Sequence, residues 1–392
     1  MKIGIDVHSI GRGSGGNETY YKCLLEGLLR TNAQHRYVLY STNVGSLRSA
    51  GFPHPNFLIR DIKPGDPYSR IIFSFAVQLR REPVDVFHAQ FIVPSFLKCR
   101  TVTTIPDIAY EHFPEFFPPY QKAWSKVLIR RSARRADHII TVSQYSKNDL
   151  VNTYDIPPEK ITVTYEAIGN EFYPRDNSQA RDRIASRYGI GSPFVLYLGR
   201  LQGRKNLVRL VEAYSIVRQA GCPHKLVLAG GKDSMFMPVV ERIRELRLEE
   251  DVVFPGYIPS QEVPWFYNAA SAFIYPSLFE GFGLPVVEAM ACGTPVVTAR
   301  GSALEEIAAG AALIVDPLDV TSIAGGLQKV LEDQDLRSRL INAGLKRSAS
   351  FSCEETARQT VAVYEKVLGT ELVPELLGDW TPNRAYSNSK RL

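Results

Sequence analysis

Two glutamates separated by seven residues lie in the segment of the sequence that is richest in reactive and turn-forming groups. Glu280 and Glu288 flank a Gly-Phe-Gly-Leu-Pro run and follow the apolar stretch 272–275. A carboxylate can accept two hydrogen bonds from vicinal hydroxyls, which is how proteins hold ribose and hexose rings. The spacing predicts a sugar- or nucleoside-binding site, with Glu280 in a loop and Glu288 in the first turn of the next helix.

The loop between the glutamates also has the composition of an anion site. Two glycines free the backbone for a tight turn, and Pro285 suits the first position of a helix. The exposed amides would point at a bound group, and the helix dipole favours an anion there; these amides belong to Gly281, Phe282, Gly283 and Leu284. Either glutamate alone could merely cap a turn or complement the dipole, but the combination favours a ligand site.

A second group of candidates follows another apolar run, 194–198. Arg200 and Lys205 lie five residues apart across a glycine-containing turn that opens a helix. Such a pair can converge on a diphosphate, the arginine through its planar fork and the lysine as a point charge. It would neutralise the charge that a departing nucleoside diphosphate acquires. Arg204 could take the place of Lys205, and a solvated turn is the alternative interpretation.

Alternating strands and helices must position these groups. Apolar or β-branched runs predict strands at 2–8, 37–40, 84–88, 101–105 and 138–142, and the pattern restarts after a polar stretch with runs at 194–198, 225–229, 252–254, 272–275, 295–298 and 312–315. This alternation predicts an α/β fold of parallel sheets covered by helices. We expect two doubly wound domains that face an interdomain cleft, because ligands bind at the carboxyl ends of such sheets.

The polar stretch at 174–193 sets the domain boundary. We expect an N-terminal domain at 1–175, a C-terminal domain at 176–350, a helix at 351–369 that packs back toward the N-terminal domain, and a frayed tail at 370–392. With 392 residues, two domains are the expected number.

The composition excludes several classes of protein. With 45% hydrophobic and 22% charged residues, the chain is not expected to be disordered, collagenous or a coiled coil. No apolar run reaches the 18 or so residues of a membrane span, and Asp6 interrupts the stretch that a signal peptide would need. The five cysteines form an odd, widely spaced set without C-x-x-C. We therefore expect a cytoplasmic protein in a reducing compartment, without a metal-ligand cluster.

Four segments together resemble glycosyltransferase family 4, whose members are retaining enzymes of the two-domain GT-B fold. They are the E-x7-E segment at 280–288, the G-R-x4-K-N turn at 199–206, the glycine-rich loop at 11–16 and the stretch at 251–270. The resemblance runs from Gly4 to Leu368 and is strongest to the mannosyltransferase-B-like branch of bacterial polysaccharide assembly. It implies transfer of a hexose, mannose from GDP-mannose above all, to a glycan or lipid-linked glycan acceptor. The N-terminal domain would face the acceptor, and the C-terminal domain would hold the nucleotide sugar.

The resemblance also implies a role for each candidate residue. Glu288 would hold the ribose, Glu280 the transferred hexose, and Arg200 and Lys205 the diphosphate. The further residues implied in donor binding are the backbone near Tyr257 and Ile258, for the base, and Gly15 and Gly16, which would let the first loop approach the phosphates or the acceptor closely.

No metal or other cofactor is expected. Metal-dependent sugar transferases need a D-x-D at a strand end, where two carboxylates hold the bridging cation. The D-x-D of this sequence, Asp333-Gln-Asp335, falls in a polar turn between two helical patterns and reads as a solvated helix end. Charge neutralisation is left to arginine and lysine.

One departure from the family pattern affects the acceptor side. Family members commonly carry a His-Asp pair after the strand at 101–105, but here Pro106 precedes Asp107. Proline cannot hydrogen-bond through a side chain or shuttle a proton. Asp107 remains a catalytic candidate, and His112 or His8 could reach the same cleft, although His112 is equally well explained as a structural loop residue.

A predicted basic helix suggests contact with an anionic membrane. Lys122, Lys126, Arg130 and Arg134 recur at spacings of four, with Trp124, Val127 and Leu128 expected on the opposite side. Such a helix can rest on anionic lipid, so peripheral contact with the inner face of a membrane is one interpretation. The alternative is a solvated face whose apolar side packs on the sheet. Nucleic acid is not an expected partner.

Three other functions remain compatible with parts of the sequence. A nucleotide-sugar epimerase or hydrolase could use the same fold, and a non-catalytic sugar-nucleotide-binding module is conceivable because of Pro106. A nicotinamide-dependent dehydrogenase is disfavoured, because the glycines from Gly11 to Gly16 lack a clear G-x-G-x-x-G register and no acidic residue ends a second strand at the required distance.

Overall fold

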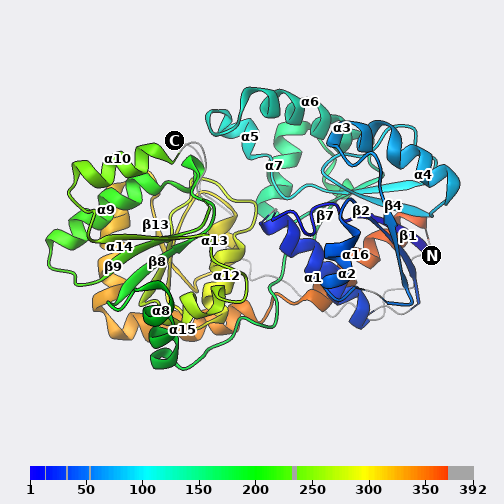
Figure 1. The fold of residues 1–392 in the computed structure, drawn as a ribbon. Helices are drawn as coiled ribbons and strands as arrows, with labels where there is room; N and C mark the ends of the chain where they lie inside the picture. The colour runs from blue at the N-terminus through cyan, green and yellow to red at the C-terminus, as the bar shows by residue number, and fades with distance from the viewer. Residues whose placement is uncertain (14, 32–33, 53, 232–235, 370–392) are drawn as a thin grey trace.

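The computed structural model describes residues 1–13, 15–31, 34–52, 54–231 and 236–369. The tail expected at 370–392 lies outside these residues. The chain forms two α/β domains, with the N-terminal domain in blue and cyan and the C-terminal domain in green and yellow (Figure 1).

The N-terminal domain contains a parallel sheet of seven strands in the order β3-β2-β1-β4-β5-β6-β7. In the centre, Ile5 of β1 pairs with Leu39 of β2 on one side and with His88 of β4 on the other. The strands are β1 (Lys2–Asp6), β2 (Arg36–Ser41), β3 (Phe57–Asp61), β4 (Val86–Gln90), β5 (Arg100–Thr104), β6 (His138–Thr141) and β7 (Ile161–Val163). Five of them confirm predicted strands; β3 and β7, at the two edges, were not predicted.

Helices cover both faces of this sheet (Figure 1). The longest, α1 and α6, carry apolar residues at helical spacing that point into the domain core. The helical segments are α1 (Gly16–Thr31), α2 (Val44–Ser49), α3 (Pro67–Ser69), the π-helical η1 (Arg70–Ser74), α4 (Phe75–Arg81), α5 (Ala109–His112), η2 (Pro114–Phe116), α6 (Pro119–Arg135), α7 (Gln144–Tyr154) and η3 (Pro158–Lys160).

The C-terminal domain contains a parallel sheet of six strands in the order β10-β9-β8-β11-β12-β13. The strands are β8 (Phe194–Leu198), β9 (Lys225–Ala229), β10 (Val252–Gly256), β11 (Ala272–Tyr275), β12 (Val296–Ala299) and β13 (Leu313–Val315). The helical segments are α8 (Asn177–Tyr188), η4 (Gly203–Lys205), α9 (Leu207–Gln219), α10 (Met237–Glu245), α11 (Val263–Ala269), α12 (Leu284–Ala291), α13 (Ala303–Ala308), α14 (Val320–Glu332) and α15 (Gln334–Ser348).

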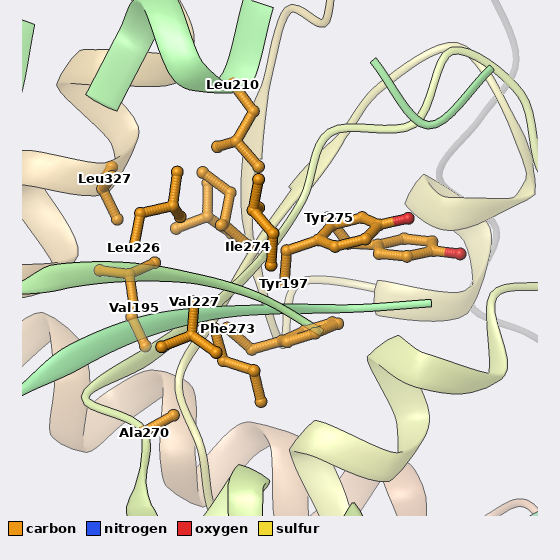
Figure 2. Packing of buried hydrophobic residues seen from close by; sticks show 14 of the residues in the cluster. Val195, Tyr197, Leu210, Leu226, Val227, Ala270, Phe273, Ile274, Tyr275 and Leu327 are labelled. Atoms are coloured by element: carbon orange, nitrogen blue, oxygen red, sulfur yellow. The ribbon is translucent and has the colours of Figure 1, made fainter. Parts of the chain in front are cut away.

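The core of this domain explains why its strands read as continuous apolar runs. Helices lie on both faces of the sheet, so successive residues of a strand, such as Val227 and Leu228, are both fully buried. Each such side chain contributes roughly 1.5–3 kcal/mol through burial. Figure 2 shows this packing, and it shows Tyr197 and Tyr275 stacked side by side at the ends of their strands, with ring centroids 5.6 Å apart.

The last helix, α16 (Cys353–Leu368), leaves the C-terminal domain and packs beside α1 (Figure 1). Its Tyr364 hydroxyl lies 2.7 Å from Nδ1 of the buried His88, and Cys353 is joined to Cys23 of α1 in a disulfide. The expectation that the cysteines are all reduced is therefore wrong for this pair. The two cysteines are 330 positions apart in sequence, and only the return of α16 brings them together.

Candidate active site between the two domains

A cavity of about 650 Å³ lies between the carboxyl ends of the two sheets and is lined by residues of both domains. Parallel strands leave their loops and helix N-termini at this edge, so polar groups converge there. The predicted site residues that line the cavity are Gly15, Gly16, Asp107, Arg200, Arg204, Lys205, Tyr257, Ile258, Glu280, Gly281, Phe282, Gly283, Leu284 and Glu288.

A second hollow of about 780 Å³ lies near the opposite end of the N-terminal sheet, beside residues such as Asp85, Arg100 and Asp137. Arg100 and Asp137 already form an ion pair with each other at 2.9 Å. This hollow is open and lies away from the carboxyl ends of the strands, so the interdomain cavity is the better candidate site.

Glu280 forms the centre of a buried charge cluster. Its carboxylate contacts the ammonium of Lys205, and the Arg204 guanidinium lies 3.2 Å from its other oxygen. Burial alone would raise the pKa of Glu280, but the two cations outweigh burial and hold its pKa at about 2. Burial lowers the pKa of Lys205 to about 8 despite the neighbouring carboxylate. Both partners are therefore charged at neutral pH.

The turn that carries the two cations is fixed to the loop that carries Glu280. Asn206 adopts a left-handed conformation, with φ of 62°, directly before α9. Its side-chain amide donates hydrogen bonds to the carbonyls of Pro276, at 3.1 Å, and Pro317, at 2.6 Å. Asn206 ends the G-R-x4-K-N motif, for which the sequence predicted no structural role, and its two hydrogen bonds hold Lys205 opposite Glu280.

Arg200 occupies a different part of the cavity from the other two cations. Its side chain is exposed, whereas Lys205 is buried and also donates a hydrogen bond to the Tyr275 hydroxyl at 2.7 Å. Arg204 and Lys205 both lie beside Glu280 and contact different oxygens of its carboxylate. Arg200, Arg204 and Lys205 therefore all line the cavity, whereas the sequence predicted a pair of cations.

Glu288 lies deeper along α12. Its carboxylate accepts a hydrogen bond from the Tyr267 hydroxyl at 2.8 Å, and burial raises its pKa to about 7. Because α12 begins at Leu284, Glu288 is in the second turn of the helix and not in the first, as the sequence suggested. Gly283 precedes the helix with φ of 106°, and a Cβ atom there would lie 2.5 Å from Leu304, so both conformation and space require glycine.

The loop before α12 is also the point where the domains touch. A Cβ atom on Gly281 would lie 2.8 Å from Cβ of Asp107. The Gly281 carbonyl accepts a hydrogen bond from the Ser143 hydroxyl at 2.7 Å, at the start of α7. Phe282 and Leu284 are buried within the hydrophobic cluster of the N-terminal domain. These contacts place Asp107 and Glu280 on facing walls of one cavity.

The glycine-rich loop before α1 is organised by a residue that the sequence analysis missed. The Glu18 carboxylate accepts hydrogen bonds from the backbone amides of Gly11, at 3.1 Å, and Gly13, at 2.9 Å. Gly15 has φ of 61°, and the helix begins at Gly16. The N-terminus of α1 therefore opens into the cavity with its free amides.

Glu166 is a second residue that sequence reasoning missed. It lies just beyond β7, is only 6% exposed and lines the cavity. Burial, with the nearby carboxylates of Asp107, Glu280 and Glu288, raises its pKa to about 8. Nothing in the local sequence signals this environment, because the apolar run at β7 is short and was not predicted as a strand.

Comparisons with known proteins agree with this geometry. The model described as Glycosyltransferase Family 4 matches residues 14–171, and the model described as Glycosyl transferases group 1 matches residues 180–347. The O-antigen chain mannosyltransferase B of Escherichia coli is 31% identical over 285 residues, which cover 71% of this chain and 74% of that protein. This chain belongs to glycosyltransferase family 4.

Solved structures share the fold of this family 4 glycosyltransferase. Sucrose-phosphate synthase from Thermosynechococcus elongatus matches it with a TM-score of 0.76 at 20% identity, over 95% of this chain and 100% of that chain. HepE of Anabaena, solved in complex with UDP and glucose, matches with a TM-score of 0.73 at 19% identity, over 93% and 100%. The predicted GT-B architecture of two facing parallel-sheet domains is confirmed.

Neither candidate histidine of the glycosyltransferase lines the cavity. His112 is exposed, pairs with Asp149 at 2.7 Å and stacks on Phe279. His8 is half-buried and holds Asp6 through Nδ1 at 2.9 Å. The structural interpretation of His112 is thus the better one. Pro106 and Asp107 do line the cavity, so Asp107 is the N-terminal polar group that remains at the expected place.

The D-x-D of the glycosyltransferase is a helix cap. The Asp333 carboxylate accepts a hydrogen bond from the Leu336 amide at 2.8 Å, at the start of α15. Within the described parts of the chain, no three His, Cys, Asp or Glu side chains are grouped so that they could hold a metal ion. Metal independence remains a prediction.

The basic helix α6 exposes Arg130 and Arg134 as expected, but its apolar side differs from the prediction. Ile129 and Ala133 face the core, whereas Val127 is 66% exposed. Lys126 pairs with Glu111 at 2.6 Å and is therefore engaged within the fold. The prediction that Val127 packs inward is wrong, because the buried stripe of the helix lies on another face. No helix in the described residues is long and apolar enough to cross a membrane.

Proposed function

We propose that this glycosyltransferase transfers a hexose from a nucleotide sugar to a hydroxyl of a glycan or lipid-linked glycan, with retention of anomeric configuration and without a metal ion. The observation that carries the proposal is the gathering of Glu280, Glu288 and three cations around one interdomain cavity. We favour mannose from GDP-mannose, in polysaccharide assembly, because the Escherichia coli relative is named an O-antigen chain mannosyltransferase.

In this proposal, Glu288 binds the ribose. Its carboxylate can accept hydrogen bonds from both vicinal hydroxyls while the Tyr267 hydroxyl fixes its orientation. Tyr257 and Ile258 lie beyond it on the same wall and would contact the base through their backbone. UDP in the HepE structure supports a nucleotide at this kind of site, although that neighbour is only 19% identical.

The diphosphate would lie against the three cations. The Lys205 ammonium has three N–H groups, of which one contacts Glu280 and one donates to Tyr275, so the third is available to a phosphate oxygen. Arg204 and Arg200 add two guanidinium forks. Glu280, held ionised by this cluster, would accept hydrogen bonds from hydroxyls of the hexose.

Transfer then exchanges one bond at the anomeric carbon for another. The bond from the anomeric carbon to the β-phosphate oxygen breaks, and its electron pair stays on that oxygen. The acceptor oxygen forms the new bond on the same face, and its proton passes to the departing phosphate. Lys205, Arg204 and Arg200 stabilise the negative charge that develops there, which is the main catalytic contribution that these residues can make.

The N-terminal wall would receive the acceptor. Asp107 faces Glu280 across the cavity, and Gly15 and Gly16 leave the first loop without side chains, so a ligand can approach the α1 amides. Asp107 is fixed by a hydrogen bond from the Ala109 amide at 3.0 Å. It can therefore accept a hydrogen bond from the attacking hydroxyl and orient it.

We further propose that the enzyme works in the cytoplasm against an anionic membrane, through a surface that includes Arg134 of the predicted basic helix together with exposed apolar side chains. Five apolar side chains are exposed on α3, η1, α4 and α6, and we refer to them together as the outer patch: Tyr68, Ile72, Phe73, Val77 and Val127. Tyr68 contacts Trp124 of α6, with ring centroids 4.4 Å apart, which joins the two parts of the patch. Exposed Arg131 and Arg134 of α6 complement anionic headgroups.

The proposed activity is tested by supplying the purified chain with GDP-, UDP-, ADP- and dTDP-sugars, with and without a glycan acceptor, in the presence of EDTA. We expect product only with acceptor, from one nucleotide class, and at an undiminished rate in EDTA. Conversion of the donor without acceptor would indicate an epimerase or hydrolase. Binding without any turnover would indicate a binding module, and loss of activity in EDTA would contradict metal independence.

A further inference from the structure

Glu166 is the buried carboxyl of the cavity to which the proposed function assigns no role. It follows β7 on the N-terminal wall and is 6% exposed. None of the ion pairs and hydrogen bonds that involve a side chain in the described residues includes it, in contrast to Glu280, which contacts two cations. A buried, unpaired carboxyl that lines a ligand cavity is costly unless it is neutral or meets a partner in the ligand.

The carboxylates near Glu166 oppose its ionisation. They are Asp107 after β5, and Glu280 and Glu288 from the C-terminal domain. The Tyr20 hydroxyl of α1 also lies near Glu166 but is neutral. Burial, and then these carboxylates, raises the pKa of Glu166 to about 8. Lys205 and Arg204 contact Glu280 and offset part of its charge, so burial is the main cause of the raised pKa of Glu166. At neutral pH the Glu166 carboxyl therefore carries a proton.

We propose that Glu166 is a hydrogen-bond donor to the bound nucleotide sugar. Its carboxyl O–H donates a hydrogen bond to an oxygen of the diphosphate or of the hexose. The inference rests on the proposed function of the cavity. A neutral carboxyl offers one O–H donor in addition to an acceptor, whereas an ionised one can only accept. A carboxylic acid kept neutral by its surroundings can act as such a donor at pH 7.

Binding of the nucleotide-sugar donor should favour the protonated form of Glu166 further. A nucleotide sugar brings the negative diphosphate into a cavity that already holds Asp107, Glu280 and Glu288. The added negative charge disfavours ionisation of Glu166 further. Binding at a pH near or above 8 must therefore take up a proton, and affinity must fall as the pH rises and Glu166 ionises in the free enzyme.

The test is calorimetric titration of GDP-mannose and of GDP into the full chain at pH values from 6.5 to 9, in pairs of buffers with different ionisation enthalpies. The wild type, Glu166→Gln and Glu166→Leu are compared after their melting temperatures show that each is folded. Because Lys205 also has a pKa of about 8, the decisive quantity is the difference between wild type and Glu166→Gln at each pH.

We expect the wild type to take up more protons on binding at pH 8 than Glu166→Gln does. For each pH unit above 8, the affinity of the wild type should fall by roughly tenfold more than the affinity of Glu166→Gln does. Glu166→Gln, which keeps a neutral donor, should bind like the wild type at pH 7, whereas Glu166→Leu should bind roughly tenfold more weakly. An effect already present with GDP places the hydrogen bond on the diphosphate, and an effect seen only with GDP-mannose places it on the hexose.

Two results would overturn the inference. Identical pH profiles of affinity for wild type and Glu166→Gln would show that Glu166 donates no hydrogen bond to the ligand, while the proposed function would stand. Failure of the wild type to bind any of the nucleotide sugars tested above would overturn the proposed function and this inference together.

Discussion

A Cβ atom on Gly281 would lie 2.5 Å from the carbonyl oxygen of Pro106, so the backbones of the two domains meet here with no side chain between them. Gly281 belongs to the loop that carries Glu280, and Pro106 precedes Asp107. The contact therefore sets the distance between the two walls of the candidate active site. The Ser143 hydroxyl, which bonds to the Gly281 carbonyl, holds the loop in this position.

Replacing Gly281 with alanine should separate the walls. We expect kcat/KM to fall by roughly 10- to 100-fold, because displacement of a reacting group by about 1 Å costs that much. Gly191→Ala is the matched control, since a Cβ atom at Gly191 meets nothing within 4 Å. Steady-state kinetics of both variants tests the prediction, and equal activity of Gly281→Ala and Gly191→Ala would contradict it.

Glu288 should control donor affinity on the acid side of neutrality. Its pKa, raised by burial to about 7, means that the carboxylate that accepts both ribose hydroxyls forms only as the pH rises through 7. We expect nucleotide affinity to increase from pH 6 to pH 8 in the wild type. In Glu288→Gln, affinity should be roughly 10- to 100-fold weaker at pH 8 and nearly independent of pH over this range.

The measurement is nucleoside diphosphate binding by calorimetry across the same pH range. Glu241→Gln serves as the control, because Glu241 is an exposed glutamate on α10, far from the cavity lining. A pH profile in Glu288→Gln that rises as steeply as in the wild type would remove Glu288 from the ribose site.

Glu280→Gln should separate catalysis from nucleotide binding. The variant loses the charge that faces the hexose, so we expect kcat to fall by about two orders of magnitude or more. GDP affinity should stay unchanged or become tighter, because Lys205 and Arg204 are released from their carboxylate partner. Turnover and GDP binding are measured on the same preparation, and a parallel loss of both would assign Glu280 to the nucleotide.

Most of the C-terminal fold could be predicted from the sequence. The bounds of β8, β9 and β11 agree with their apolar runs, because strands covered on both faces need consecutive apolar residues. The edge strands β3 and β7 were not predicted, since only one of the five residues of β3 is buried and β7 has only three residues. Short edge strands depend on their neighbours and not on a local pattern.

The site could be predicted only where one short segment carries its own signal. Glu280 and Glu288 were found because glycines and a proline surround them. Glu166 and the disulfide between Cys23 and Cys353 depend on contacts between distant segments, so no local pattern marks them. In α6 the exposure of Arg130 and Arg134 was predicted correctly, but the buried stripe lies at Ile129 and Ala133 and not at Val127.

Glu166→Gln should stabilise the protein at alkaline pH. The folded-state pKa of about 8 lies above the ordinary value of 4.5, so the folded state binds more protons between these two pH values. The contribution of Glu166 to stability is thus full below pH 4.5 and is lost as the pH rises toward 8. We expect the melting temperature of the wild type to fall by a few °C more than that of Glu166→Gln between pH 5 and pH 8.

Thermal melts of the ligand-free proteins at closely spaced pH values check this expectation. A difference that is constant with pH would show that the substitution changes packing alone. A wild type that gains stability relative to Glu166→Gln on going to pH 8 would show that the carboxyl is ionised in the folded protein.

The outer patch should bind anionic vesicles. We expect the chain to sediment with liposomes of phosphatidylcholine and phosphatidylglycerol but not with phosphatidylcholine alone, because apolar contact and basic side chains act together. Phe73→Ser with Val127→Ser should abolish binding. Ile216→Ser is the control, since Ile216 is 42% exposed on the C-terminal domain. Equal sedimentation of the double variant and the control would place the contact elsewhere.

The return of α16 limits how the molecule can open. The polypeptide crosses from one domain to the other twice, once after β7 and once before Cys353, and the second crossing is fastened to α1 at its far side. A domain attached at two points can rotate about the line that joins them. Its other rotations are more restricted than those of a domain on a single linker. If the domains separate to admit substrate, we therefore expect a rotation about this axis, which would move the Glu280 loop away from Pro106 and back to the same position.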